Sequence, residues 1–463
     1  MSRNTLPQDL PQINLVPEPK AKRYFRFDDI GNAGRLIHLH GLNLRYVDKW
    51  GKWIVWYGNR WHEDSKSVRV TSLAKGISQS LYRELTGDEE RHKAKRRWAV
   101  ESASRRRIDA AVYLARSEAL ISHDELDADP DALGLANGWI DLRTGEFRPP
   151  DRNKLMTLRS PVRWNPDALC PRFNEAMQEW FPNVQTRSYV HRVVGKTALG
   201  SSQDDNVMII NIGDGANGKS TLARILSYIF GDYAVPIDVK LITETRYPAH
   251  DSATAVLFRR RLAIASETSR RVRLNEASVK NLTGGDEIVA RRLYEDQWRF
   301  RPTHTLWLMT NHLPEIAGRD HGIWRRIRAL PWVAHFNRTK DSNLDNQLKR
   351  EAAGILRWIV RGAQDYLANG LDEPEEVLAA TKDYRHKEDI IARWREECGY
   401  VFDRALSTPA SQLVESWTKW TELVLDRPRR FLEVATFLEE SGCTRFRKGE
   451  NKLLHWLGIG KTK

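Results

Sequence analysis

The sequence predicts an α/β protein with a parallel sheet at its centre, and three observations lead to this fold class. The run "VMIINI" (207–212) is continuously apolar and ends at a glycine, as a buried parallel strand does. Apolar residues then recur at helical spacing from Leu222 to Phe230, and Gly231 stops the pattern. Further strand candidates follow at 261–266, 303–310 and 326–333.

The segment before this core predicts a smaller α+β region. Residues 45–64 have aromatic and β-branched residues interrupted by Gly and Asn, which predicts a small antiparallel sheet. A strongly basic helical stretch is expected at 91–120, and "LANGWIDLRTGEFRPP" (135–150) predicts a hairpin. Two helices are expected within 170–200. The polar, Pro-rich start of the chain predicts a flexible arm without a secretory signal.

The C-terminal part predicts a separate small unit. A Pro/Glu linker at 371–377 follows a helical region, and helices are expected around 388–401, 409–425 and 431–441. A short basic hairpin after them favours a winged-helix module. The expected domains are an arm (1–25), an accessory domain (26–170), a central domain with leading helices (171–370) and a winged-helix-like domain (378–463).

Composition narrows the class of partner. The net charge is +13 and the pI about 9.6, which indicates a polyanionic partner, nucleic acid first and an anionic membrane surface second. No apolar run of about 18 residues is present, so a membrane span is not expected. Cys170, Cys398 and Cys443 lie far apart, without metal-ligand spacing. We therefore expect a cytoplasmic, reduced protein without a metal cluster.

The stretch "GDGANGKST" matches the phosphate-loop pattern G-x-x-x-x-G-K-[ST] between a strand and a helix. Its backbone N–H groups and the helix N-terminus favour phosphate, Lys219 would reach the β- and γ-phosphates, and Ser220 would ligate Mg²⁺. A chance Gly-rich turn is the alternative, and the strand–helix context argues against it. The candidate nucleotide-binding residues are Gly213, Asp214, Gly215, Ala216, Asn217, Gly218, Lys219, Ser220 and Thr221.

Three later positions complete a candidate hydrolytic site. Glu267 ends an apolar run, where a carboxylate would order Mg²⁺ and polarise water, although the usual hydrophobic-Asp form is absent. Asn311 ends another run and would sense the γ-phosphate. Arg325 and Arg326 precede a third, where one of them would act on a neighbouring subunit's nucleotide. The plainer alternatives are a surface Glu, a turn Asn and a surface ion pair.

These elements occur in one order: the G-x-G-x-N-G-K-S-T loop, a strand ending in Ser-Glu, a strand ending in Thr-Asn-x-x-Pro, then Gly-x-x-Arg-Arg. The order resembles superfamily 3 helicases, and more closely the helicase region of phage and plasmid primases of the satellite-phage type. It is similar also to the poxvirus primase-helicase. The likeness extends over about 27–463. It implies an AAA+-like ATPase core, with an α+β accessory domain before it and a winged helix after it.

The resemblance also gives a role to the segment "KNLTGGDEIVARRLYEDQWRFRP" (280–302). It matches a family motif that carries a hairpin pointing into the central channel of a ring. Lys280, Arg291, Arg292 and Tyr294 are the matching basic and aromatic positions, suited to phosphates and to a base or sugar. Without the family, the segment predicts only a basic hairpin interrupted by Gly.

The expected function is an ATP- and Mg²⁺-dependent DNA helicase of phage, plasmid or mobile-element replication. It would form a homo-oligomeric, hexameric ring on single-stranded or forked DNA. Larger relatives carry a primase-polymerase domain, for which about 25 leading residues are too few, so a separately encoded primase or initiator is an expected partner. The basic stretch 91–107 is either a DNA contact or a solvated helix face. A DNA-binding ATPase switch without unwinding activity is the main alternative, and a small-molecule kinase leaves the charge unexplained.

Overall fold

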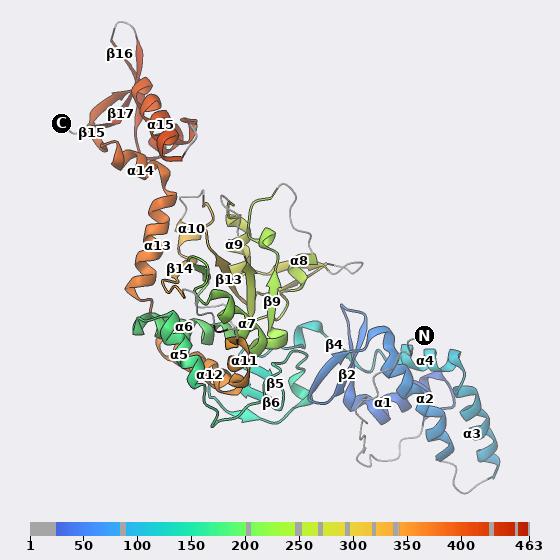
Figure 1. Cartoon of the computed structure of the whole chain (residues 1–463). Helices are drawn as coiled ribbons and strands as arrows, with labels where there is room; N and C mark the ends of the chain where they lie inside the picture. The colour runs from blue at the N-terminus through green and yellow to red at the C-terminus, as the bar shows by residue number, and fades with distance from the viewer. Residues whose placement is uncertain are drawn as a thin grey trace, which may run out of the picture.

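The computed structural model describes residues 25–83, 89–200, 205–245, 252–266, 272–291, 297–316, 321–336, 341, 343–425, 430–449 and 452–461. The expected arm, Glu267, Arg292 and Tyr294 lie outside the described residues, apart from the arm's last residue. Figure 1 shows an N-terminal region in blue, a central sheet with its helices, and a C-terminal unit joined to the centre through one helix. The expected α/β class with a parallel sheet is confirmed.

All five strands of the central sheet run parallel, in the order β14-β8-β13-β10-β9. Four of them are the apolar runs picked out in the sequence, and the short fifth strand, which contains a proline, was not predicted. These strands are apolar along most of their length because both faces of the sheet are covered and their side chains are buried. The strands are β8 (Met208–Ile212), β9 (Ala234–Ile237), β10 (Leu262–Ser266), β13 (Thr305–Thr310) and β14 (Ile327–Pro331).

Helices cover the two faces of this sheet. One core joins β8, β10 and β13 to α5 (Pro171–Trp180), α6 (Val184–Ala198), α7 (Lys219–Phe230) and α12 (Ala352–Asn369). Helices α6 and α12 pack so closely that a Cβ on Gly195 would lie 2.0 Å from the carbonyl carbon of Gly362. The other face is covered by α8 (Ser252–Ala255), α9 (Glu276–Thr283), α10 (His321–Trp324) and the hairpin of β11 (Ile288–Arg291) and β12 (Gln297–Phe300).

The N-terminal region contains two small sheets. The first has the order β3-β2-β1-β4, and its β1–β3 part is the antiparallel sheet expected at 45–64. Its strands are β1 (Leu44–Val47), β2 (Lys52–Tyr57), β3 (Arg60–Glu63) and β4 (Leu120–Ile121), and its helices are α1 (Asp29–His40), α2 (Val68–Arg83), α3 (Glu89–Ser102) and α4 (Arg105–Leu114). The second sheet comprises β5 (Ala132–Leu135), β6 (Gly138–Asp141) and β7 (Phe147–Arg148), and it shares its core with α5–α7.

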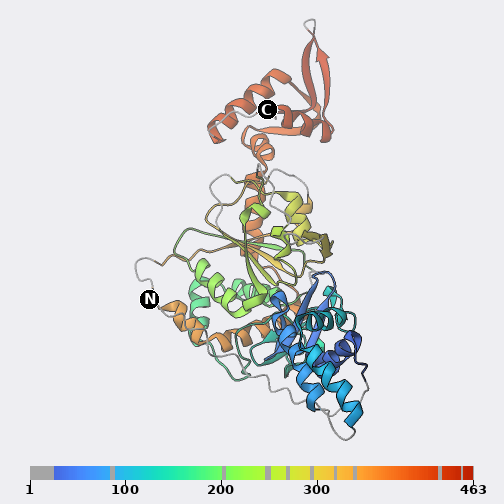
Figure 2. The same ribbon diagram turned by 90° about the vertical axis from the view of Figure 1, so that its right-hand side faces the viewer.

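The C-terminal unit combines helices with a three-stranded antiparallel sheet in the order β15-β17-β16. Figure 2 shows it at the end of α13, away from the N-terminal region. Its tryptophans pack into a core of their own. Helix α13 (Glu375–Glu388) leads from the central domain to this unit. The elements of the unit are α14 (Ile390–Glu397), β15 (Tyr400–Pro409), α15 (Ala410–Leu425), α16 (Leu432–Glu440), β16 (Thr444–Lys448) and β17 (Leu453–Lys461). The expected terminal hairpin is therefore present.

One helix boundary differs from the expectation at 388–401. The carboxylate of Asp389 accepts a hydrogen bond from the Ala392 N–H and starts a new helix, so α13 and α14 are separate. Gly399 has a φ of +72°, a conformation that ends a helix, and an unpredicted strand, β15, follows. Among the described residues, no helix has the length and apolar character needed to cross a bilayer.

Candidate nucleotide-binding site

The phosphate-loop residues form one tight turn between β8 and α7. Ala216 and Gly218 have φ values of +60° and +97°. At Gly218 a side chain is excluded by sterics as well, because a Cβ would lie 2.3 Å from the indole nitrogen of Trp180. The Gly at this position of the pattern is therefore required by the backbone and by the tryptophan beneath it.

Lys219 points into the loop. Its Nζ donates hydrogen bonds to the carbonyls of Gly213 (2.5 Å) and Asp214 (3.1 Å) and to Asn217 Oδ1 (3.1 Å). The residue is 6% exposed, and burial lowers the pKa of its amine, with the charge of Asp214 acting in the opposite direction. A buried ammonium enclosed by loop oxygens would exchange some of these contacts for phosphate oxygens when a nucleotide binds.

The segment after β14 supports the loop from one side. The Asn217 amide donates to the Trp332 carbonyl (3.4 Å), and the Phe336 N–H donates to the Ala216 carbonyl (3.1 Å). The Trp332 ring packs against Trp180, at 6.0 Å between ring centroids. Sequence reasoning missed these aromatic supports, because each lies far from the loop in the chain.

The first turn of α7 presents the remaining loop hydroxyls. Ser220 is exposed there, as a magnesium ligand needs to be, since Mg²⁺ takes oxygen ligands and keeps several waters. Thr221 accepts a hydrogen bond from Arg224 (3.1 Å), which also pairs with Asp345 at 2.9 Å. Asp345 belongs to α11 (Leu344–Arg350), so this ion pair ties α11 to the start of the phosphate-loop helix.

Strand register brings the ends of β10 and β13 level with the phosphate loop. Ser266 pairs with Met309, which in turn pairs with Asn211 of β8. Asn311 is exposed and follows Thr310, the partner of Ile212. The predicted Asn311 therefore lies at the same carboxyl edge as the loop. Glu267 follows Ser266 in the chain and lies outside the described residues.

Arg325 and Arg326 lie at the opposite edge of the sheet. β14 pairs with β8 from Ile327 to Pro331, and the Arg326 carbonyl accepts a hydrogen bond from the Met208 N–H at the start of β8. Five strand residues at about 3.3 Å each put about 17 Å between these arginines and the phosphate loop of the same chain. The structure therefore does not bring them to the loop of their own subunit.

The β11–β12 hairpin has one apolar and one polar face. Trp298 packs edge-on against Phe258 (4.8 Å between centroids) and His123 (5.5 Å). On the polar face Arg291 is exposed, and so is Arg299, a cation that sequence reasoning did not select. The predicted Lys280 is half-buried on α9, before the hairpin, and Arg292 and Tyr294 lie outside the described residues.

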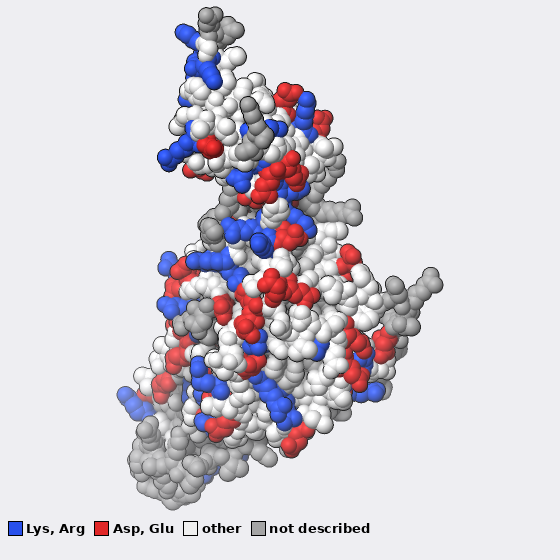
Figure 3. All heavy atoms as spheres, turned by 90° about the vertical axis from the view of Figure 1, so that its left-hand side faces the viewer, with Lys and Arg blue, Asp and Glu red and all other residues white. Residues whose placement is uncertain are grey.

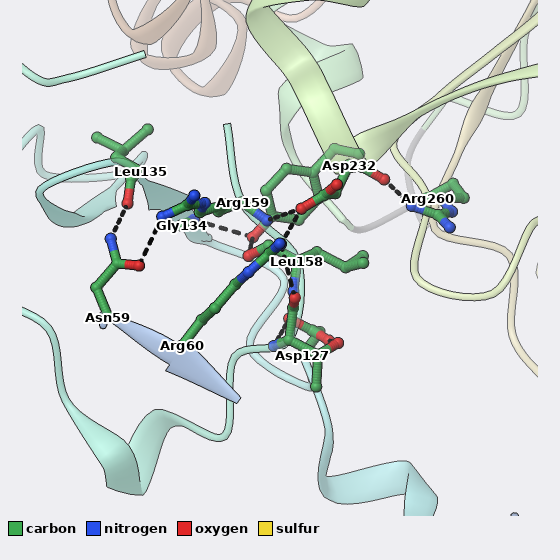
Figure 4. Close-up of polar contacts among 11 residues, drawn as sticks. Asn59, Arg60, Asp127, Gly134, Leu135, Leu158, Arg159, Asp232 and Arg260 are labelled. Carbon is green, nitrogen blue, oxygen red and sulfur yellow. Dashed lines mark hydrogen bonds and ion pairs between the residues drawn. The ribbon is translucent and has the colours of Figure 1, made fainter. Parts of the chain in front are cut away.

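The far end of α7 is held by the N-terminal region (Figure 4). Asp232, in the turn after the helix, forms an ion pair with Arg60 of β3 and accepts a hydrogen bond from the Arg159 N–H (3.2 Å). The Ser160 hydroxyl donates to the Ile229 carbonyl in the last turn of α7. One helix thus connects the phosphate loop to a polar junction with the N-terminal region.

Two family models and several viral proteins match parts of the sequence. Residues 33–182 match the family model described as D5 N terminal like, and residues 211–326 match a family of unknown function (DUF5906). A protein of Acanthamoeba polyphaga mimivirus named as a helicase is 28% identical over 290 residues, which cover 58% of this chain and 30% of the relative. These matches make the chain similar to D5-like primase-helicases.

Similar proteins come from other viruses. A Sputnik virophage protein named as a helicase is 28% identical over 269 residues, 53% of this chain and 34% of its own. An African swine fever virus protein named as a primase is 24% identical over 375 residues, 73% of this chain and 38% of its own. The chain spans about a third of the length of these relatives.

Among solved structures, the C-terminal region of NrS-1 in its apo form aligns with a TM-score of 0.49 at 11% identity. The alignment covers 90% of this chain and 96% of that one. The fold of this chain is assigned from its own strands and helices and not from this alignment.

Proposed function

We propose that this chain is the motor subunit of a DNA helicase, an AAA+-like ATPase of superfamily 3 that works as a hexameric ring with ATP between subunits. The phosphate loop is the observation that carries the proposal. It places a buried lysine among loop oxygens, beside the exposed Ser220 and level with the ends of β10 and β13. Relatives named as viral helicases support nucleotide hydrolysis at the level of the family.

Four residues from the loop and the neighbouring strand ends would act in hydrolysis. Lys219 would hold the β- and γ-phosphates, and Ser220 with Glu267 would hold Mg²⁺, which neutralises charge on the phosphates when bound. Glu267 would also orient the attacking water, with Asn311 beside it. The register supports this assignment, because it places the ends of β10 and β13 level with the phosphate loop.

The ring is supported by the position of the double arginine. Arg325 is exposed, whereas the Arg326 guanidinium donates to the Gly322 carbonyl at 2.7 Å. We therefore take Arg325 as the residue that reaches a neighbour's ATP. A group about 17 Å from its own phosphate loop can act on a nucleotide only from the adjoining subunit.

DNA contact in the channel is assigned to the β11–β12 hairpin, whose exposed Arg291 is one of the predicted DNA-binding residues. The C-terminal unit supports a winged-helix assignment, since α14, α15 and α16 alternate with β15 and a final hairpin. On the face drawn in Figure 3, basic side chains gather along that hairpin and near the place where the C-terminal unit joins α13. We propose that the C-terminal unit also contacts DNA.

The test is strand separation. Purified protein with ATP and Mg²⁺ should unwind a forked DNA, its ATPase activity should rise with single-stranded DNA, and particles on the fork should be rings. DNA-stimulated hydrolysis without unwinding would instead establish the alternative, a DNA-binding ATPase switch. Hydrolysis indifferent to DNA would contradict both.

A further inference from the structure

The corner between α3 and α4 concentrates positive charge. Residues 91–107 contain eight Lys and Arg against one Glu, a net charge of +7 within a chain of +13. Neither the phosphate loop nor the hairpin uses these residues. Figure 1 draws α3 at the end of the N-terminal region that lies farthest from the C-terminal unit.

Helix α3 buries one face and turns its cations outward. The buried face of α3 includes Trp98 and Ala99, which lie in the core of the N-terminal region. Lys93, Arg96 and Arg97 are exposed and stand at the i, i+3 and i+4 spacing of one helix face. Their separation along the helix axis is therefore about 6 Å from first to last, so all three can contact one ligand.

The first turn of α4 extends this surface. Arg105 and Arg106 are exposed at its start. Partial compensation comes from two ion pairs on the helices themselves, Arg97–Glu101 at 2.9 Å and Arg105–Asp109 at 3.4 Å. A third ion pair joins Arg107 to Asp29 of α1 at 2.8 Å. Among the exposed cations that the structure describes in this corner, Lys93, Arg96 and Arg106 have no ion-pair partner.

This arrangement costs helix stability. Like charges at i, i+3 and i+4 repel one another and destabilise a helix. Arginines in a first turn without an acidic residue oppose the helix dipole, and α4 begins in this way. A solvated face of mixed charge would avoid both costs, so the cluster indicates a polyanion that relieves the repulsion when it binds.

We propose that this corner, defined as Lys93, Arg96, Arg97, Arg105 and Arg106, is a second DNA-binding surface that holds the phosphate backbone of duplex DNA. The inference rests on the proposed function, because it takes DNA as the polyanion. Duplex is favoured over single strand because Trp98, the one Trp, Tyr or Phe of α3, is buried and offers no stacking platform. Contact through phosphates alone is independent of sequence.

The experiment measures binding to a short blunt duplex by fluorescence anisotropy, without nucleotide, across a range of salt. The variant K93Q/R96Q/R97Q should bind about 10–100-fold more weakly near physiological salt, with a salt slope smaller by about 2–3, because each lost phosphate contact removes about 0.9. The charge-retaining variant K93R/R96K/R97K should bind as the wild type does.

A matched control removes the same charge elsewhere. R143Q/R148Q/R152Q changes three exposed arginines, two of which already pair with Asp131 and Glu146, and it should leave the affinity and slope nearly unchanged. Wild-type affinity and slope in K93Q/R96Q/R97Q, or a wild type that does not bind duplex, would overturn the proposal and leave the corner to an acidic protein partner. The readout needs no ATP, so a wild type that fails to unwind DNA refutes the motor without deciding this surface.

Discussion

The two edges of the central sheet carry different chemistry. At the carboxyl edge the phosphate loop and Asn311 stand together on neighbouring strands and face solvent. At the amino edge the Arg261 guanidinium is buried and donates to backbone carbonyls of the N-terminal region, among them Pro130 at 2.7 Å. The exposed Arg325 lies at the same edge, two residues before the outer strand β14.

This contrast separates two proposed tasks, which are binding of the nucleotide within one subunit and completion of the hydrolytic site by the neighbouring subunit. In the proposed mechanism the carboxyl edge holds the nucleotide, whereas the amino edge is mostly structural and supplies Arg325 to a neighbouring subunit. Changes at the first edge should therefore abolish the function of each subunit, changes at Arg325 should act between subunits, and changes at the buried contacts should act on stability.

Lys219→Ala should have the largest effect. Its ammonium is the one cation enclosed by the described loop residues, so ATP turnover should fall to background, a loss of more than about 10³-fold. DNA binding in the absence of nucleotide should stay near the wild-type level. Lys240→Ala, an exposed lysine of the same domain, is the control and should turn over normally. Retained turnover in Lys219→Ala would refute the loop assignment.

Arg325→Ala should reduce turnover by about 10³-fold, the low end of what an arginine supplied in trans contributes. When variant and wild-type subunits are mixed, activity should fall more steeply than the variant fraction, because each variant subunit disables a neighbour's site. Arg326→Ala is the comparison: it loses the contact to the Gly322 carbonyl and should lower thermal stability more than turnover. A linear loss on mixing would argue against action between subunits.

The sequence predicted the parts of this contrast that depend on local pattern. Apolar runs predicted four of the five parallel strands, and the loop motif predicted where a phosphate would bind. Both signals are local, because each is contained in a few consecutive residues. The support of Gly218 by Trp180 joins positions 38 apart, and the Asp232–Arg60 pair joins positions 172 apart. A single sequence carries no signal for such contacts. The unpredicted β15 alternates poorly in polarity, and its strand conformation depends on pairing with β17, which is distant in the chain.

Ser160→Ala should test the junction at the far end of α7. The fully buried hydroxyl donates to the Ile229 carbonyl and accepts from the Val162 N–H (3.1 Å), so its loss leaves two buried groups unpaired. We expect a loss of about 2 kcal/mol in the free energy of unfolding, measured by denaturant titration. Ser117→Ala, an exposed serine of the N-terminal region, should cost little. The KM for ATP should hold steady, and a change in KM at unchanged stability would show that the junction governs the loop directly.

The smallest effect is expected at His304, just before β13 at the amino edge. Burial, together with the smaller effect of the Lys196 charge, lowers the pKa of this imidazole to about 4. The unfolded chain, with a pKa near 6.5, binds the proton more readily than the folded protein does between these values. The stability that neutral His304 supports is therefore complete above about pH 6.5 and is lost as the pH falls toward 4. At pH 5.5 we expect roughly 1 kcal/mol less than at pH 7.5 from this residue. His304→Gln should flatten that part of the pH profile, whereas His386→Gln, an exposed histidine, should not. An equally steep profile in His304→Gln would place the acid sensitivity in other groups.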